Sequence, residues 1–307
     1  MKNIITPPYL QPGDTIGITC PSGYLPAERT IQAKRILESW GFKVLIGTTV
    51  GSEHFYFSDN DERRLHDLQM MLDNKEVKAI LKGRGGYGLS RIIDDIDFTA
   101  FQENPKWISG FSDITVLHSH IHAQFGIATL HSPMCAAFKE ETEFSDHILS
   151  LLKAWTGQAI SYPTSTHERN RNGEGAGLLV GGNLAILAHL SGSASQINTD
   201  GKILFIEDIG EYLYNADRML LNLKRSGMFD NLAGLICGGF TDMQDTERPF
   251  GQSIYDIICD KVNEYAYPVC FDFPVGHQDI NFTLKLGVAH TLSVTDDKVR
   301  LILLNTL

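Results

Sequence analysis

The sequence contains little cysteine and no arrangement that would put cysteine to use. Five cysteines are spread over 307 residues, no two of them form a CxxC pair, and most stand inside apolar segments. Disulfide frameworks and zinc sites need paired or closely spaced cysteines. We therefore expect reduced cysteines that pack as small apolar side chains.

Long apolar runs and positive charge are also scarce. No stretch approaches the roughly 20 apolar residues that span a bilayer, and the N-terminal segment lacks the apolar core of a signal peptide. We expect a cytoplasmic protein without a membrane partner. Lys and Arg number 26 against 37 Asp and Glu, a formal net charge of -11. Phosphate binding needs clustered basic residues, so nucleic acid is not an expected partner.

What the sequence does contain is typical of a large globular enzyme. Its hydrophobic content of 43% and charged content of 21% are ordinary for a folded domain. A chain of 307 residues is long enough for two domains with their own cores.

The first half alternates between strand-like and helix-like segments. Strands are expected at 15–19, 43–46, 77–81, 107–110 and 128–130, and helices at 27–40, 59–72 (with Asp59 as N-cap) and from 115 onward. This alternation predicts an α/β fold with a parallel sheet and helices on both faces.

A polar stretch at 161–177 contains Pro and Gly and predicts a linker. It would separate an N-terminal domain, 1–160, from a C-terminal domain, 178–307. In the latter, strands are expected at 178–180, 202–206, 235–237, 291–294 and 299–303, and helices at 183–190 and 216–225.

Ser112 is the first candidate for chemistry. It follows the expected strand Trp107–Gly110 by two residues, and a helical pattern begins at Thr115. A hydroxyl at a sharp strand-to-helix turn stands clear of the backbone, and the helix N-terminus favours a developing negative charge. Acyl-transfer enzymes place their nucleophile at such turns. The alternative is an ordinary turn or helix-capping serine.

The glycine run Gly83–Gly88, between an expected strand and an expected helix, fits two functions. It matches G-x-G-x-x-G, the dinucleotide-binding pattern, although the first strand lacks the pattern and Asp113 would have to bind the ribose. The run can equally supply an oxyanion hole, in which the amides of Gly85 and Gly86 act together with that of Asp113. A plain tight turn is the third possibility.

Two further positions carry groups suited to proton transfer. Glu207 ends an apolar strand, where side chains in open α/β sheets face ligands. His277 follows Gly276 in an expected loop, and histidine can both accept and return a proton near neutral pH. Each could instead be a solvated strand end or a structural histidine. His118 and His122 have i, i+4 spacing, but no third ligand is evident, so no metal is expected.

Together these segments resemble, in their order along the chain, the LD-carboxypeptidase family, the muramoyltetrapeptide carboxypeptidases. No single segment is specific, but the ordered set is, and it covers nearly the whole chain. The segments lie at 10–18, 84–88, 110–113, 130–134, 181–184, 206–208, 217–220 and 276–277.

The resemblance implies a catalytic triad and a substrate. Ser112 would be the nucleophile, His277 the general base and Glu207 its orienting acid. The amides near Gly86 and at Asp113 would hold the oxyanion, with no metal or organic cofactor. The substrate would be a murein tetrapeptide that loses its terminal D-Ala in peptidoglycan recycling. A carboxypeptidase must recognise a free carboxylate, and Arg84 could do so through a bidentate contact, unless it forms a structural ion pair.

The family fold combines an N-terminal flavodoxin-like domain with a smaller C-terminal α/β domain that has a β-barrel-like core. The resemblance also implies a homodimer. Several positions depart from the family pattern without removing a catalytic group: Cys20, Ser132, Gln278 and Lys285. Two alternatives remain: a hydrolase of peptidyl or acyl nucleotides of the microcin C self-immunity type, and a nucleotide-binding protein that uses Gly83–Gly88.

Overall fold

The computed structural model describes residues 4–304, which form two compact units. The first contains the chain up to Ile160 together with Phe282–Lys285, and the second contains Ser161–Asn281 and the chain from Leu286 onward. The sequence predicted two contiguous domains. The return of four residues to the first unit differs from that prediction.

The first unit is built on a six-stranded sheet in the order β10-β5-β4-β3-β1-β2. Strands β1 to β5 are parallel, and their order 2-1-3-4-5 is that of flavodoxin-like folds. The predicted fold class of this half is therefore confirmed. The strands are β1 (Thr15–Thr19), β2 (Lys43–Ile46), β3 (Val77–Lys82), β4 (Trp107–Gly110), β5 (Thr129–His131) and β10 (Leu284–Leu286).

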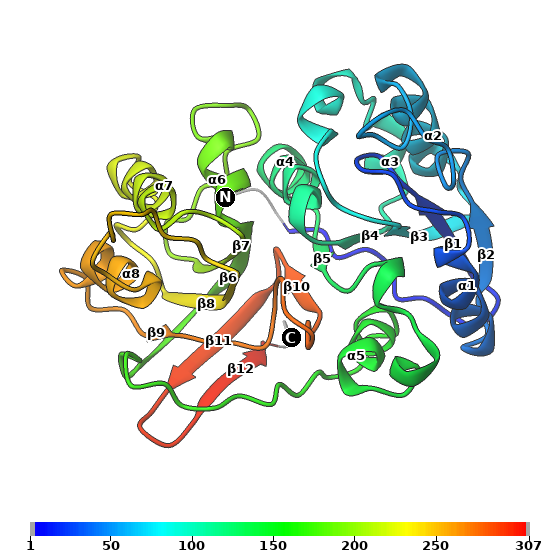
Figure 1. Cartoon of the computed structure of the whole chain (residues 1–307). Coiled ribbons are helices and arrows are strands. Elements are labelled where there is room, and N and C mark those ends of the chain that lie inside the picture. The colour runs from blue at the N-terminus through cyan, green and yellow to red at the C-terminus, as the bar shows by residue number, and fades with distance from the viewer. Residues whose placement is uncertain (1–3, 305–307) are drawn as a thin grey trace. The chain divides into compact units, whose positions relative to one another are not determined.

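Helices cover both faces of this sheet, with α2, α3 and α4 on one side and α1 and α5 on the other (Figure 1). They are α1 (Arg29–Ser39), α2 (Asp61–Asp73), α3 (Thr99–Glu103), α4 (Thr115–Phe125) and α5 (Asp146–Trp155). The sequence predicted Asp59 as the N-cap of α2. The cap is Asn60 instead, whose side chain accepts a hydrogen bond from the Arg63 amide at 2.9 Å.

The glycine run Gly83–Gly88 leads into short 3₁₀ turns, η1 (Leu89–Arg91) and η2 (Ile93–Asp95), and not into an α-helix. The helix predicted between this run and the Trp107 strand is α3, which begins only after these turns. A dinucleotide site needs the N-terminus of an α-helix directed at the pyrophosphate. The structure of this loop therefore disfavours the dinucleotide-binding interpretation.

The second unit has a six-stranded mixed sheet in the order β12-β11-β6-β7-β8-β9. Strands β6 to β9 are parallel, and β11 and β12 run antiparallel beside β6. This curled mixed sheet is the expected barrel-like core. Strand β6 begins at Gly173, inside the predicted linker 161–177. The strands are β6 (Gly173–Asn183), β7 (Ile203–Ile209), β8 (Gly234–Thr241), β9 (Val269–Cys270), β11 (Ala289–Val294) and β12 (Val299–Leu303).

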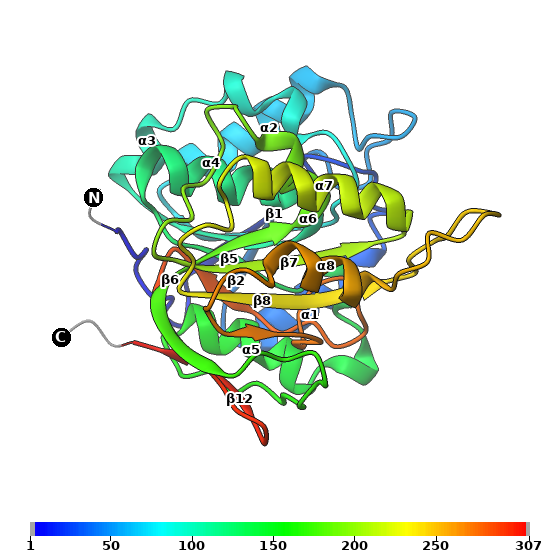
Figure 2. The same ribbon diagram turned by 90° about the vertical axis from the view of Figure 1, so that its left-hand side faces the viewer.

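Three helices pack on this unit, α6 (Leu184–Leu190), α7 (Leu213–Arg225) and α8 (Ile254–Val262). Figure 2 shows α6 and α7 side by side over the strands. Their apolar faces and those of β6 to β9 form one buried cluster, which includes Leu187, Leu204, Leu220, Leu235 and Ile258. Alternation of strand and helix along the chain brings each carboxyl strand end to the same edge of the sheet, and Glu207 lies there.

The absences noted in the sequence have simple structural counterparts. All five cysteines are free thiols, and four of them are buried. Burial raises the pKa of the Cys20 thiol to about 12, so this side chain packs as a neutral group. Within residues 4–304, no helix has the length and apolar character needed to cross a bilayer.

Candidate active site

Ser112 occupies the tight connection between β4 and α4. Its φ of 66° lies in the left-handed region, which costs a non-glycine residue roughly 1 kcal/mol or more. The turn continues through a 3₁₀ segment, Ser112–Ile114, directly into α4. The predicted turn is therefore present, and its strained backbone is what exposes a nucleophile in other folds.

The glycine loop lies directly against this serine. A Cβ added at Gly85 would stand 2.9 Å from Ser112 Cβ and 3.1 Å from its Oγ, so only glycine permits this approach. The Gly85 carbonyl accepts a hydrogen bond from the Gly23 amide at 3.0 Å, which fixes the loop. Gly86 has a φ of 106°, which favours glycine. The first unit thus brings Ser112 and the predicted oxyanion loop together.

Asp113 is a structural carboxylate that fixes the turn at Ser112. It is 1% exposed, and its Oδ2 accepts hydrogen bonds from Ser22 Oγ at 2.6 Å and from the Leu89 amide at 3.0 Å. Burial raises the pKa of Asp113, while these two bonds oppose the rise. Because its oxygen is used inside the protein, the side chain is not placed to bind a ribose. Only its backbone amide remains a candidate for the site.

Arg84 is exposed at the start of the glycine loop. Its guanidinium donates to the Tyr24 carbonyl at 3.2 Å. No carboxylate in the described part of the chain pairs with Arg84, so the structural ion pair considered from the sequence is not present there. The side chain keeps the capacity to bind an external carboxylate.

Glu207 and His277 form a tight pair in the second unit. His277 Nδ1 donates to Glu207 Oε2 at 2.6 Å, and the His277 amide donates to the same oxygen at 3.0 Å. Glu207 is completely buried. Gly276 makes the approach possible, because a Cβ there would lie 2.7 Å from Glu207 Oε2 and its φ is 101°. The chain therefore brings together two residues that are 70 positions apart.

The environment of His277 suits a general base that becomes a cation. Burial opposes its positive charge, but the hydrogen bond and the negative charge of Glu207 outweigh burial, and the pKa of His277 is raised. A carboxylate on Nδ1 holds the proton on that nitrogen and leaves Nε2 as the base. This is the arrangement of the acid and base in a hydrolytic triad.

Asp208, the neighbour of Glu207, has a different role. Its carboxylate accepts from Asn183 Nδ2 and from the Ala185 amide, both at 2.9 Å, at the start of α6. Burial and, less strongly, the charge of Glu207 raise the pKa of Asp208 to about 6. Asp208 therefore anchors a helix to the strand end that carries Glu207. The sequence showed two adjacent carboxylates, but not that one contacts His277 and the other anchors α6.

Two buried basic groups lie near the serine turn. The sequence did not single out Lys82, and it offered His118 only as part of a possible metal-binding pair. Lys82, at the end of β3, is fully buried, and its Nζ has no hydrogen-bond partner among residues 4–304. Its side-chain carbons lie 3.1 Å from the Cβ position of Gly110. His118 on α4 is bonded through Nε2 to the Gly110 carbonyl at 2.9 Å. His118 is thus tied to the turn, and spacing in the sequence could not have revealed the position of either group.

The chain is an α/β protein in which one unit carries a strained serine beside a glycine loop and the other carries a buried carboxylate–imidazole pair. Comparison with known proteins gives the particular family. The LD-carboxypeptidase N-terminal domain matches residues 16–132, and the LD-carboxypeptidase C-terminal domain matches residues 176–292. The chain belongs to the LD-carboxypeptidase family and is a peptidase.

Individual relatives agree with this assignment. The probable murein peptide carboxypeptidase of Bacillus subtilis is 33% identical over 94% of this chain and 92% of its own length. The murein tetrapeptide carboxypeptidase of Pseudomonas aeruginosa is 28% identical over 85% of this chain and 87% of its own. The crystal structure of muramoyltetrapeptide carboxypeptidase from Oxalobacter formigenes has a TM-score of 0.85 at 28% identity and covers 94% of this chain and 98% of its own.

Proposed function

We propose that this protein is a serine carboxypeptidase that removes the terminal D-Ala from murein tetrapeptides. The cleaved bond joins D-Ala to the L-centre of the third residue, a diamino acid. The observation that carries the proposal is the buried Glu207–His277 pair in a chain that also presents Ser112 in a strained turn. The relatives named as murein peptide carboxypeptidases supply the substrate class.

The reaction would proceed through an acyl-enzyme. Ser112 Oγ attacks the carbonyl carbon while His277 takes its proton, and the tetrahedral intermediate collapses as His277 gives that proton to the departing D-Ala nitrogen. Water then attacks the ester while His277 takes its proton, and His277 returns that proton to Ser112 Oγ as the tripeptide leaves with a new carboxylate. Glu207 stabilises the imidazolium in both steps.

The glycine loop would bind the oxyanion of the tetrahedral intermediate, and Arg84 would bind the free carboxylate of the terminal D-Ala. The amides of Gly86 and Asp113, with Gly85 beside them, would hold the oxyanion, because Gly85 already lies against Ser112. Arg84, which has no carboxylate partner among residues 4–304, would bind the free carboxylate of D-Ala.

The test is D-Ala release from free murein tetrapeptide, followed by mass spectrometry for the wild type and Ser112→Ala without added metal. Loss of the nucleophile should lower the rate by roughly 10⁴-fold or more. Ser90→Ala changes an exposed serine near the glycine loop and serves as the matched control. Equal rates for the wild type and Ser112→Ala would refute the assignment of the nucleophile.

A second candidate is hydrolysis of peptidyl or acyl nucleotides with the same residues. The microcin C7 self-immunity protein of Escherichia coli is 26% identical over 90% of this chain and 89% of its own length, which supports this candidate. Wild-type protein that leaves tetrapeptide intact but hydrolyses an aminoacyl nucleotide analogue would favour it. Retention of an absorbing nucleotide without hydrolysis of either substrate would point instead to a nucleotide-binding protein.

We also propose that the protein works in the cytoplasm as a homodimer, as the family resemblance implies. Sedimentation at micromolar concentration tests the dimer, and a monomer that retains full D-Ala release would contradict it.

A further inference from the structure

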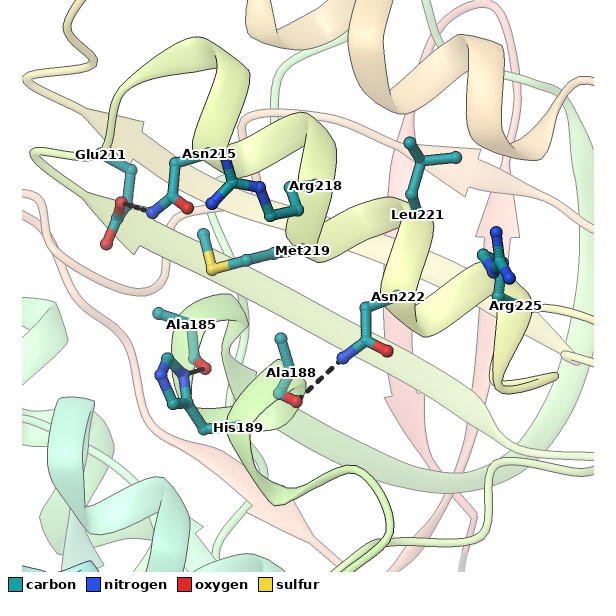
Figure 3. Close-up of a pocket in the computed structure, with 10 residues that line it drawn as sticks. All are labelled: Ala185, Ala188, His189, Glu211, Asn215, Arg218, Met219, Leu221, Asn222 and Arg225. Atoms are coloured by element: carbon teal, nitrogen blue, oxygen red, sulfur yellow. Dashed lines mark hydrogen bonds between the residues drawn. The ribbon is translucent and has the colours of Figure 1, made fainter.

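A cavity of about 640 Å³ lies between α6 and α7 in the second unit. Figure 3 shows its residues arranged along the gap between the two helices. The floor is apolar, formed by small side chains of α6 and by Met219, and polar groups stand at both ends. The lining consists of Ala185, Ala188, His189, Glu211, Asn215, Arg218, Met219, Leu221, Asn222 and Arg225. Cavities of this size commonly hold small-molecule ligands.

One end of this cavity is tied by hydrogen bonds to the residues around Glu207 and His277. The Gly210 amide donates to the Thr241 carbonyl at 2.9 Å, and Thr241 Oγ1 donates to the His277 carbonyl at 2.6 Å. Glu211 follows Gly210 directly. On the opposite wall, the Ala185 amide is bonded to Asp208. The Glu211 end of the cavity therefore lies at the strand edge that carries Glu207, beside the loop of His277.

The charges along the cavity are unusual for an acidic chain. Arg218 and Arg225 project from exposed positions of α7, and in residues 4–304 no carboxylate is within ion-pair distance of either. Arg218 lies over the Tyr214 ring at 5.4 Å. Glu211, the one carboxylate of the lining, accepts a hydrogen bond from Asn215. The cavity thus presents one negative group near the site and two positive groups farther along.

The spacing of these charges fits a short peptide. Arg218 and Arg225 are seven residues apart on one helix, which places their backbone atoms about 10 Å apart along the axis. An extended peptide covers that distance in roughly three residues. A small ligand with one charge would use only one end of the cavity.

We propose that the α6–α7 cavity binds the acyl side of the substrate peptide. Glu211 binds the side-chain ammonium of the diamino residue next to the cleaved bond, and Arg218 and Arg225 bind carboxylates farther toward the start of the peptide. This inference rests on the proposed function. It names the residues that would select a peptide with an ammonium group beside the cleaved bond and carboxylates nearer its start.

Equilibrium binding separates this subsite from the chemistry. Calorimetry with murein tetrapeptide and Ser112→Ala protein measures affinity without turnover. Adding Arg218→Gln or Arg225→Gln should weaken binding about tenfold each, the size expected for a charge-assisted hydrogen bond, and should reduce the dependence on salt. Arg300→Gln, an exposed arginine on β12 of the same unit, is the matched control. Unchanged affinity in both cavity variants, or an equal loss in the control, overturns the proposal.

The role of Glu211 has its own test, a comparison of two peptides. Glu211→Gln should weaken binding of the parent tetrapeptide about fivefold and leave binding of the peptide with an acetylated side-chain amine unchanged. Equal effects on both peptides refute the ammonium contact. Ala188→Leu, which fills the floor, should weaken both peptides, whereas Ile186→Leu on the same helix lies outside the lining and should weaken neither. Thermal unfolding confirms that each variant is folded.

The outcome for the subsite is independent of the outcome for the reaction. Wild-type D-Ala release with arginine variants that bind normally would reject the subsite and keep the function. Arginine-dependent binding without D-Ala release would keep the subsite and reject the reaction. Absence of both binding and release would reject both.

Discussion

Glu207 and Asp208 are neighbours in β7, and their side chains have different partners because successive strand side chains point to opposite faces of a sheet. Glu207 is bonded to His277, and Asp208 is bonded to the first turn of α6. Two adjacent residues of one strand therefore have separate partners, His277 for Glu207 and the start of α6 for Asp208. At the residue scale, burial raises the pKa of Asp208 to about 6.

The first prediction concerns the pH dependence of the reaction. His277 acts as a base only when neutral, so kcat/KM should rise as pH increases through its pKa. Because Glu207 holds that pKa above the usual value of histidine, the acid limb should lie above about 6.5. Glu207→Gln removes the charge, so the limb should move to lower pH and the plateau should fall by roughly 10²- to 10⁴-fold.

The matched control is Asp279→Asn, an exposed carboxyl two residues from His277. It should leave both the limb and the plateau of the kcat/KM profile unchanged. An acid limb that stays in place in Glu207→Gln would mean that Glu207 does not set the protonation of His277.

The second prediction concerns the stability cost of Lys82. Burial lowers the pKa of Lys82 to about 7, although the charge of Asp67 opposes the shift. In the unfolded chain this amine titrates near 10.5, so the unfolded state binds more protons between those values, and the free energy of unfolding should increase with pH there. Lys82→Met should therefore stabilise the protein more at pH 6 than at pH 9, by about 2–3 kcal/mol.

Urea unfolding at the two pH values measures this difference. Lys106→Met tests a less buried lysine, whose pKa is lowered only to about 8, and should show a smaller pH-dependent gain. An equal gain from Lys82→Met at both pH values would show that Lys82 is charged in the folded state throughout the range.

At the scale of elements, α6 is a short helix that depends on its first turn. Asn183 Oδ1 accepts from the Ile186 amide at 3.2 Å, and Asn183 Nδ2 donates to Asp208. A helix of seven residues has little stability of its own, so its N-cap and its packing hold it in place. The same hydrogen bonds hold the end of β7 that carries Glu207. Loss of the α6 N-cap should therefore also disturb the candidate active site.

The third prediction follows from this network. Asn183→Ala should lower the free energy of unfolding by about 1–2 kcal/mol and should also lower kcat, because Asp208 loses a partner beside Glu207. Ser253 caps α8 in the same manner but is not bonded to β7. Ser253→Ala should therefore reduce stability and leave kcat unchanged. A normal kcat in Asn183→Ala would show that the N-cap of α6 does not influence the active site.

Elements with strong local signals could be predicted, and pairings between distant segments could not. The alternation from Thr15 to Phe125 gave the parallel sheet, and the turn at Ser112 gave the strained serine, because both depend on neighbouring residues. The hydrogen bond between Glu207 and His277 is a long-range contact, and only the family resemblance predicted that the two residues would pair. The start of β6 at Gly173 was missed because glycines and polar residues hide a strand. The positions of the charged side chains along the α6–α7 cavity could not be predicted from the sequence.

At the scale of the whole molecule, the first unit is completed by a segment from the far end of the chain. Strand β10 lies on the outer edge of β5, and the Thr283 amide donates to Ser150 Oγ at 2.9 Å. Lys285 Nζ lies 4.9 Å from the centre of the Tyr9 ring, and Lys285 is buried. The contiguous domain 1–160 predicted from the sequence therefore lacks part of its own sheet.

The fourth prediction is that residues 1–160 alone will not behave as a stable domain. Without β10, the edge of β5 exposes unpaired backbone groups, and exposed strand edges promote aggregation. The fragment should elute as aggregates in size-exclusion chromatography, and the emission of its buried Trp107 and Trp155 should be shifted toward that of exposed indole. A fragment in which a Gly/Ser linker joins 1–160 to 280–287 should be monomeric with native-like emission.

The second fragment makes the experiment decisive, because the two differ only in the linker and the returning segment. If both were equally soluble and showed the same emission, β10 would be dispensable and a boundary near residue 160 would suffice. If only the second folds, the chain must leave the first unit, build the second and return before the first sheet is complete. In that case the sheet that carries Ser112 cannot be finished until the segment after His277 has been made, so a chain truncated before β10 cannot place Ser112 on a complete sheet.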